Sequence, residues 1–359
     1  MSTGSSTTAP IPPHPPRITA VLPCFNHEVY LERRIDSVLR QTLPVSEILF
    51  LDDASSDGSV PLARRLLAAA TVPVRFLLRT TNSGSPFVQW NEGVKQASGD
   101  YVWIAETDDA CDDCLLERLW APLAACDGLL AFAQSRLVDA DGASHGTALL
   151  FTDRYWPGVF AADLQLSGAA FTARFLTAQN VIYNASSVLF RRSAFLAAGL
   201  ANPSMRFCGD WDLWLRLLAT GGDVAFVADP LNQFRNHDHT TRARGHTAEV
   251  QAEYMACRLT AALIAEASPG GAPEQCHLGA LSLFVRQLRG RRDLLPPLRT
   301  VMPQAARDAR RHYERLQRVP RLGVSAWYLI DHFPAIDRFT VRLGLLRQRL
   351  LRFLVPTGH

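Results

Sequence analysis

Short apolar runs alternate along the first third of the chain with stretches in which apolar residues recur at helical spacing. Four runs have the length and residue types of buried strands: ITAVLP (18–23), EILFLDD (47–53), VRFLLRT (74–80) and YVWIAE (101–106). Three segments between them have helical periodicity: HEVYLERRIDSVLRQT (27–42), SSDGSVPLARRLLAAA (55–70) and FVQWNEGVKQA (87–97). This strict alternation predicts an α/β fold with a doubly wound, mostly parallel, Rossmann-like sheet.

The pattern changes twice further along the chain. Residues 129–234 mix strand-like stretches and loops with one clear helix, DWDLWLRLLATG (210–221), which has an acidic first turn and a glycine stop. Beyond residue 243 the chain reads as helical, and its last stretch, 336–354, is amphipathic with arginines flanking an apolar face. We therefore expect three parts: a disordered leader (1–16), an α/β domain (17–242) and a basic, partly amphipathic helical C-terminal region (243–359).

Polar residues gather where the predicted strands end. Pro23, Asp53, Asn82 and the run from Glu106 to Asp109 each follow a different strand. In a doubly wound sheet, ligands bind beyond the carboxyl ends of the strands. The acidic run alone is more typical of a solvated loop, but its place beside Asp53 favours a site that binds ribose hydroxyls and a divalent cation, because Mg²⁺ and Mn²⁺ prefer oxygen ligands.

Two further acidic residues, Asp210 and Asp212, begin the predicted helix. Acidic residues are favoured there by capping and by the helix dipole, so the residues alone leave a structural and a catalytic role equally open. The chain has neither GxGxxG after its first strand nor GxxxxGK[ST], and the dinucleotide and P-loop functions therefore lack their motifs.

Charge is unevenly distributed along the chain. The net charge of the 359 residues is +3, but residues 281–359 contain 16 Arg against 5 Asp or Glu. Such a basic tail predicts contact with an anionic partner such as a membrane surface, and a packed appendage with arginines toward solvent is the equal alternative. No apolar run reaches the roughly 18 residues that span a bilayer, and the seven cysteines form no disulfide framework. We expect a cytoplasmic protein, peripheral on the inner face of the cell membrane if the tail binds lipid.

Four segments resemble family 2 glycosyltransferases with the GT-A fold. They are ITAVLPCFNHEVYLERRIDSVLRQTLPVSEILFLDDASSDGS, NSGSPFVQWNEGVKQASGDYVWIAETDD, NASSVLFRRSAFLAAGL and GDWDLWLRLLATGG. Each is weak alone, but together they follow the order of the family's motifs over roughly residues 18–240.

The resemblance implies a role for each matching position. The nucleotide-sugar site would contain Pro23, Phe25, Asp53, Asn82, Gly84, Glu106 and Arg235. The metal would be held by Asp108, Asp109 and His237, and Asp210 matches the catalytic base. Two positions depart from the family: Glu106 stands where an Asp is common, and Gly209 replaces the Glu that commonly precedes the base.

The implied reaction is an inverting, Mn²⁺- or Mg²⁺-dependent transfer of a sugar from a nucleoside-diphosphate sugar, with a UDP-sugar favoured. The acceptor would be a glycan or lipid-linked hydroxyl in the synthesis of a bacterial surface polysaccharide or another envelope glycan, and no nucleic-acid partner is expected. A degenerate relative that binds sugar or membrane without catalysis is one alternative, although the chain keeps Asp53, Asp108 and Asp210. A nucleotidyltransferase is another, but PCFNHEVYLERR stands where its Gly-rich basic signature would lie.

Overall fold

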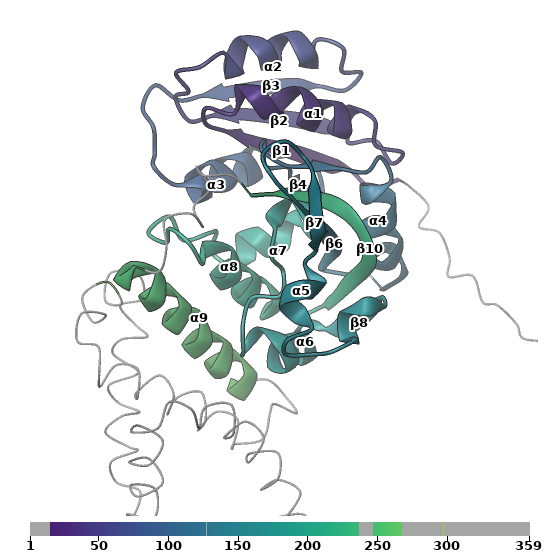
Figure 1. Cartoon of the computed structure of the whole chain (residues 1–359), viewed down its shortest axis with the longest axis vertical. Coiled ribbons are helices and arrows are strands. Elements are labelled where there is room, and N and C mark those ends of the chain that lie inside the picture. The colour runs from purple at the N-terminus through teal and green to yellow at the C-terminus, as the bar shows by residue number, and fades with distance from the viewer. Residues whose placement is uncertain (1–14, 127, 237–246, 268–296, 298–359) are drawn as a thin grey trace, which may run out of the picture. The chain divides into compact units, whose positions relative to one another are not determined.

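The first half of the described chain forms an α/β layer. The computed structural model describes residues 15–126, 128–236, 247–267 and 297 (Figure 1). Its first four strands are β1 (Ile18–Cys24), β2 (Glu47–Asp52), β3 (Val74–Leu78) and β4 (Tyr101–Ile104), paired in parallel in the order β3-β2-β1-β4. They are connected by α1 (Glu28–Leu39), α2 (Ser59–Leu67) and α3 (Pro86–Gln96). The predicted alternation of strands and helices is therefore confirmed.

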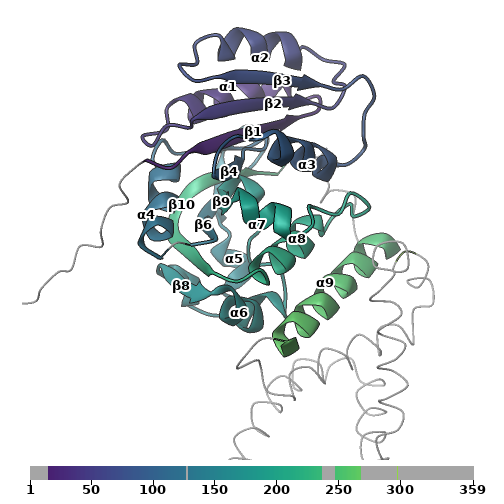
Figure 2. The same cartoon turned by 180° about the vertical axis from the view of Figure 1, so that it is seen from behind.

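These helices cover both faces of the parallel strands. α1 and α2 lie on one face and α3 on the other, as the opposite views of Figures 1 and 2 show. Every residue of β1 is buried, and a continuous apolar run is typical of a strand that is covered on both faces. α3 approaches β1 closely at Gly93, where a Cβ atom would lie 2.4 Å from the side chain of Val21.

Beyond β4 the sheet continues in mixed orientation. β9 (Val188–Arg191) runs antiparallel to both β4 and β6 (Leu130–Val138), and β10 (Asp223–Arg235) pairs in parallel with β6. Of the described strands on the path β3-β2-β1-β4-β9-β6-β10, only β9 is reversed, so this central sheet is mostly parallel as predicted. Short strands pair antiparallel at its margin: β5 (Ala110–Cys111) and β8 (Leu164–Ser167) with β10, and β7 (Ser144–Thr147) with β6.

The remaining helices surround this second half of the sheet. They are α4 (Leu115–Cys126), α5 (Leu149–Thr152), α6 (Gly168–Phe171), α7 (Arg192–Ala197), α8 (Gly209–Leu218) and α9 (Ala248–Ala267), with 3₁₀ turns at Val159–Ala161 and Ala185–Ser187 and a π turn at Thr172–Leu176. α8 is anchored by the fully buried Trp214, whose ring centroid lies 6.4 Å from that of Trp90 in α3 and 5.9 Å from that of Phe190 in β9. This packing fixes α8 against the sheet.

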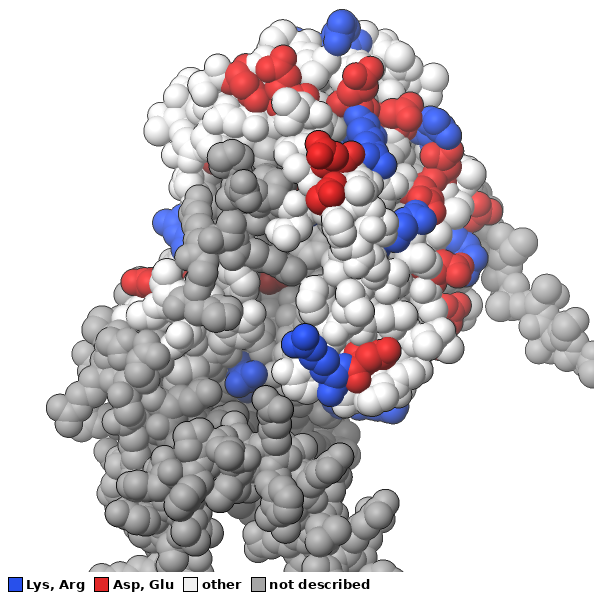
Figure 3. Space-filling model, in the orientation of Figure 1, with Lys and Arg blue, Asp and Glu red and all other residues white. Residues whose placement is uncertain are grey.

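Some predicted features lie outside the described residues. These are residues 1–14 of the leader, His237 in the segment 237–246, and the amphipathic stretch at 336–354, so the domain limits at 16 and 242 stay predictions. No helix in the described part is long and apolar enough to cross a membrane. On the face drawn in Figure 3, acidic and basic side chains of the described residues are interspersed and form no broad basic patch.

Candidate functional site

The predicted donor-binding residues lie at the carboxyl edge of the parallel strands. Pro23, Asp53 and Glu106 are at or just beyond the ends of β1, β2 and β4, which point the same way. The hydroxyl of Thr107 donates to the carbonyl oxygen of Pro23 at 2.8 Å and thereby ties the acidic loop to β1. Phe25 is 41% exposed and offers an apolar surface beyond the end of the same strand.

Asp53 organises the loop that follows β3. Its buried carboxylate accepts hydrogen bonds from the backbone N of Ser83 at 3.0 Å and from Ser83 Oγ at 2.7 Å, and it lies 3.1 Å from Nε of Arg79. The amide of Asn82 donates to the carbonyl oxygen of Asp53 at 3.1 Å and accepts from the backbone N of Gly84 at 2.6 Å. Gly84 has φ +69°, which glycine adopts at little cost. Three predicted residues, Asp53, Asn82 and Gly84, therefore belong to one hydrogen-bonded unit.

Glu106 is half-buried and held from three sides. Its Oε1 accepts from Trp90 Nε1 at 2.6 Å, its backbone N donates to Ser186 Oγ at 3.1 Å, and its carbonyl oxygen accepts from Arg34 Nε at 2.8 Å. Burial and the charge of Asp108 raise the pKa of Glu106 from 4.5 to about 8. Glu106 therefore keeps a proton near neutral pH unless a positive group approaches it.

Asp109 connects the acidic loop to two other parts of the chain. It is 3% exposed, and its two carboxylate oxygens accept from Asn184 Nδ2 at 2.7 Å and from the backbone N of Arg235 at 2.9 Å. Burial and the charge of the half-buried Asp108 raise the pKa of Asp109 to about 6. Negative groups are therefore crowded at the end of β4.

Arg34 supplies a buried positive charge beneath this loop. Its side chain is fully buried, and its guanidinium lies 5.5 Å from the ring centroid of Trp103. Its positive charge opposes, without cancelling, the rise in the pKa of both Glu106 and Asp109. Sequence reasoning missed Arg34. The signal was present, because Arg34 falls on the apolar face of α1 that is formed by Leu31, Ile35 and Val38, where a charged residue is rarely buried without partners.

Arg235 joins the acidic loop to the sheet. It is 4% exposed, and it donates from Nε to the carbonyl oxygen of Asp108 at 2.7 Å and from Nη1 to those of Asp139 and Ala140 at 2.8 Å each. Its guanidinium also lies 5.0 Å from the ring centroid of Tyr30. These contacts hold the loop in place, and a contact between Arg235 and a phosphate stays a prediction.

Asp210 lies in the first turn of α8 and is held by a segment that also holds Asp109. Its Oδ2 accepts from Asn180 Nδ2 at 2.9 Å, and its Oδ1 from the backbone N of Trp211 at 2.7 Å. Asn180 and Asn184 lie four residues apart in the segment before β9. This segment therefore contacts both the predicted base, Asp210, and the predicted metal ligand Asp109. The sequence analysis identified neither asparagine, although Asn184 begins the NASSVLF motif.

Asp212, the second acidic residue of the helix, has a different environment. Its buried carboxylate accepts from Arg216 at 2.6 Å, one helical turn further on. This i, i+4 ion pair stabilises α8, which is the structural role that the sequence left open for the position.

The acidic loop has the donor atoms of a hard-cation site. Among the described residues, no three His, Cys, Asp or Glu side chains are grouped as a complete metal site, and the predicted ligand His237 lies outside them. Mg²⁺ and Mn²⁺ commonly take only one or two carboxylates and complete their shell with substrate phosphates. Asp108 and Asp109, beside Glu106 with its raised pKa, fit such an ion because a cation would balance their crowded charge.

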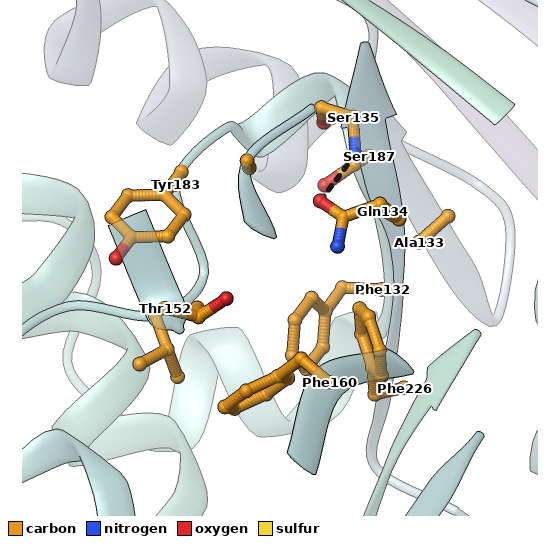
Figure 4. Close-up of a pocket in the computed structure, with 11 residues that line it drawn as sticks. Phe132, Ala133, Gln134, Ser135, Thr152, Phe160, Tyr183, Ser187 and Phe226 are labelled. Carbon is orange, nitrogen blue, oxygen red and sulfur yellow. Dashed lines mark hydrogen bonds between the residues drawn. The ribbon is translucent and has the colours of Figure 1, made fainter. Parts of the chain in front are cut away.

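A small pocket lies between β6 and the segment before β9. Figure 4 shows three aromatic rings, Phe132, Phe160 and Phe226, grouped at one end and the more polar Gln134, Ser135 and Ser187 at the other. The cavity of about 10 Å³ has room for roughly one water molecule. A sugar therefore does not fit inside it.

The amino-acid sequence of this chain is similar to those of known glycosyltransferases. The model of the family "Glycosyl transferase family 2" matches residues 19–195. A poly(ribitol-phosphate) beta-N-acetylglucosaminyltransferase of Staphylococcus aureus is 32% identical over 106 residues, which are 29% of this chain and 32% of that protein. The chain thus spans about a third of the length of this relative.

Solved structures share its fold. S. aureus TarS, residues 1–349, in complex with UDP-GlcNAc aligns with a TM-score of 0.58 at 13% identity, over 80% of this chain and 82% of that one. A mannosyltransferase from Pyrobaculum calidifontis in complex with GDP-Man and Mn²⁺ aligns with a TM-score of 0.53 at 15% identity, over 98% and 91% of the two chains. The chain therefore resembles glycosyl transferase family 2 through its residues 19–195, and it has the GT-A fold.

Proposed function

We propose that the chain is an inverting glycosyltransferase that moves a sugar from a nucleoside-diphosphate sugar to an acceptor hydroxyl. The observation that carries the proposal is the link between its acidic groups. Two asparagines of one short segment donate hydrogen bonds, Asn180 to Asp210 and Asn184 to Asp109. The carboxylate proposed to act on the acceptor and a carboxylate proposed to bind the donor's metal ion are thereby held by the same segment.

In this reaction Asp210 is the general base. Its carboxylate takes the proton of the acceptor hydroxyl while the hydroxyl oxygen bonds to the anomeric carbon from the face opposite the diphosphate. The bond from the anomeric carbon to the diphosphate oxygen breaks, and its electron pair leaves with the diphosphate. A single displacement of this kind inverts the anomeric configuration. Asn180 keeps one oxygen of the base in a fixed direction.

The donor lies along the ends of β1, β2 and β4 in this proposal. Asp53 binds the base, Glu106 the ribose, and a Mn²⁺ or Mg²⁺ ion at Asp108 and Asp109 would stabilise the charge of the leaving diphosphate. Support for this donor class comes from the UDP-GlcNAc and from the GDP-Man and Mn²⁺ that the two structural neighbours bind. We favour a UDP-sugar.

The proposed acceptor is a bacterial envelope glycan, free or lipid-linked. The relative that acts on poly(ribitol-phosphate) supports an acceptor of this class. The basic C-terminal region would bring the enzyme to the anionic inner surface of the cell membrane, where it could reach a lipid-linked acceptor.

Turnover of a panel of UDP-, GDP- and dTDP-sugars with Mn²⁺ or Mg²⁺ tests the proposal. We expect one donor to react only with a metal ion present, and Asp210→Asn to lower kcat by roughly 10²- to 10⁴-fold while donor binding persists. Asp212→Asn, on the same helix, is the control and should keep kcat near that of the wild type.

Two outcomes would contradict the proposal. Full activity of Asp210→Asn would remove the base from the mechanism. A folded wild-type protein that binds and turns over no donor of the panel would favour a degenerate relative that binds sugar or membrane.

A further inference from the structure

A buried carboxylate of α9 contacts the backbone directly before α8. Glu253 is 1% exposed, and it accepts hydrogen bonds from three consecutive backbone N–H groups: Arg206 at 2.7 Å, Phe207 at 2.8 Å and Cys208 at 2.7 Å. The next residue, Gly209, is the first of the helix that carries Asp210.

The residue directly before α8 supplies no capping side chain. The first N–H groups of a helix lack partners within the helix, and a side chain directly before it usually accepts from them. Cys208 occupies that position, and its side chain makes no capping hydrogen bond. Glu253 lies 45 residues further along the chain, accepts from the N–H groups leading into the helix, and places a negative charge beside its positive end.

The segment that Glu253 holds is connected to both sides of the candidate site. Arg206 donates from its guanidinium to the carbonyl oxygen of Gly84, in the loop that Asp53 organises. In the other direction the segment leads within two residues to Asp210. A shift of these three amides would therefore displace the helix start and the loop together.

α9 also contacts the segment that orients Asp210 from the other side. Arg258 Nε donates to the carbonyl oxygen of Ala178 at 3.2 Å, two residues before Asn180, and Cys257 Sγ donates to the carbonyl oxygen of Cys208 at 3.6 Å. Asn180 donates a hydrogen bond to Asp210. α9 thus contacts the backbone that leads to each of these two residues.

We propose that Glu253 is a positioning residue that holds the backbone leading into α8 from α9 and so fixes the carboxylate of Asp210 for catalysis. The inference rests on the proposed role of Asp210 as the base. It assigns part of the active-site geometry to a helix that lies beyond the residues matched by the family model.

Glu253→Gln in the full-length chain tests the inference. The amide has the shape of the carboxylate but only one accepting oxygen, and its NH₂ group would oppose a backbone N–H. We expect kcat to fall at least about tenfold, because small misplacements of a catalytic group are costly, while the KM for the donor stays within about twofold. Hydrogen exchange of the amides of residues 206–208 should become faster in the same variant.

Asp212→Asn is the matched control, since it removes a buried carboxylate and its ion pair with Arg216 from the same helix. It should lower Tm without the loss of kcat and without faster exchange at 206–208. Equal losses of kcat in the two variants at equal Tm, or wild-type kcat in Glu253→Gln, would overturn the inference. Unchanged hydrogen exchange at residues 206–208 in Glu253→Gln would also overturn the inference. Absence of donor turnover by the wild type would refute the proposed function instead, and the exchange measurement would still test the role of Glu253.

Discussion

Glu106, Asp108 and Asp109 are neighbours in the sequence, but their carboxylates have different surroundings. Glu106 accepts from an indole N–H, whereas one oxygen of Asp109 accepts from Asn184 and the other from the backbone N of Arg235. Burial is the largest cause of the raised pKa in both, and the charge of Asp108 is the next. The residue types predict an acidic cluster, and the packing around each side chain decides how tightly it holds its proton.

Glu106→Gln should reduce the pH dependence of stability in the metal-free protein. An unfolded Glu loses its proton near pH 4.5, whereas native Glu106 keeps it to about pH 8. Between these values the native state binds more protons than the unfolded state, so the free energy of unfolding falls as pH rises. Thermal melts in EDTA should show a fall of Tm across this range that is steeper for the wild type than for the variant.

Glu32→Gln, at an exposed position of α1, is the control and should keep the slope of the wild type. Added Mn²⁺ should flatten the wild-type slope, because a cation favours the ionised carboxylates. Parallel curves for the wild type and Glu106→Gln would show that burial of Glu106 does not hold its proton.

α8 begins with a glycine where the family commonly has a Glu, and packing between helices explains the difference. A Cβ atom at position 209 would lie 2.3 Å from the ring of Phe87, which belongs to α3. The close approach leaves no space for a side chain before Asp210. The contact of α8 with α3 therefore excludes the second carboxylate, and the helix start is held instead by Glu253 of α9.

Gly209→Ala should destabilise the protein by about 1–3 kcal/mol, as extra atoms do in a filled space. Alanine has the higher helix propensity, so helix formation alone would predict the opposite sign. Urea unfolding of Gly209→Ala, Phe87→Leu and the double variant measures the coupling between the two positions. The double variant should recover part of the loss, and simple additivity of the two changes would contradict the steric explanation.

Charge is divided unevenly between the last 79 residues of the sequence and the rest of the chain. Residues 281–359 carry a net charge of +11 and the rest of the chain −8, counted from the sequence. On the face of the described residues drawn in Figure 3, charges of both signs are mixed. We therefore expect any attraction to anionic surfaces to come from the C-terminal region and not from that face of the domain.

Deletion of residues 336–359 should release the protein from anionic liposomes at moderate salt. The deletion removes five arginines, each worth about 1 kcal/mol near an anionic surface, together with apolar residues that recur at helical spacing in the sequence. Co-sedimentation with anionic vesicles measures the effect, and neutral vesicles serve as the control. Undiminished binding after the deletion would place the contact elsewhere.

The sequence by itself determined the alternation of strands and helices, the polar residues at the strand ends and the resemblance to the family, because these depend on local periodicity and residue type. Only the tertiary structure decided which groups hold the site. Arg34 reaches Glu106 across 72 positions, Asn184 reaches Asp109 across 75, and Glu253 reaches Cys208 across 45. Such hydrogen bonds follow from how strands and helices pack, and residues so far apart leave no periodic pattern by which one chain could reveal them.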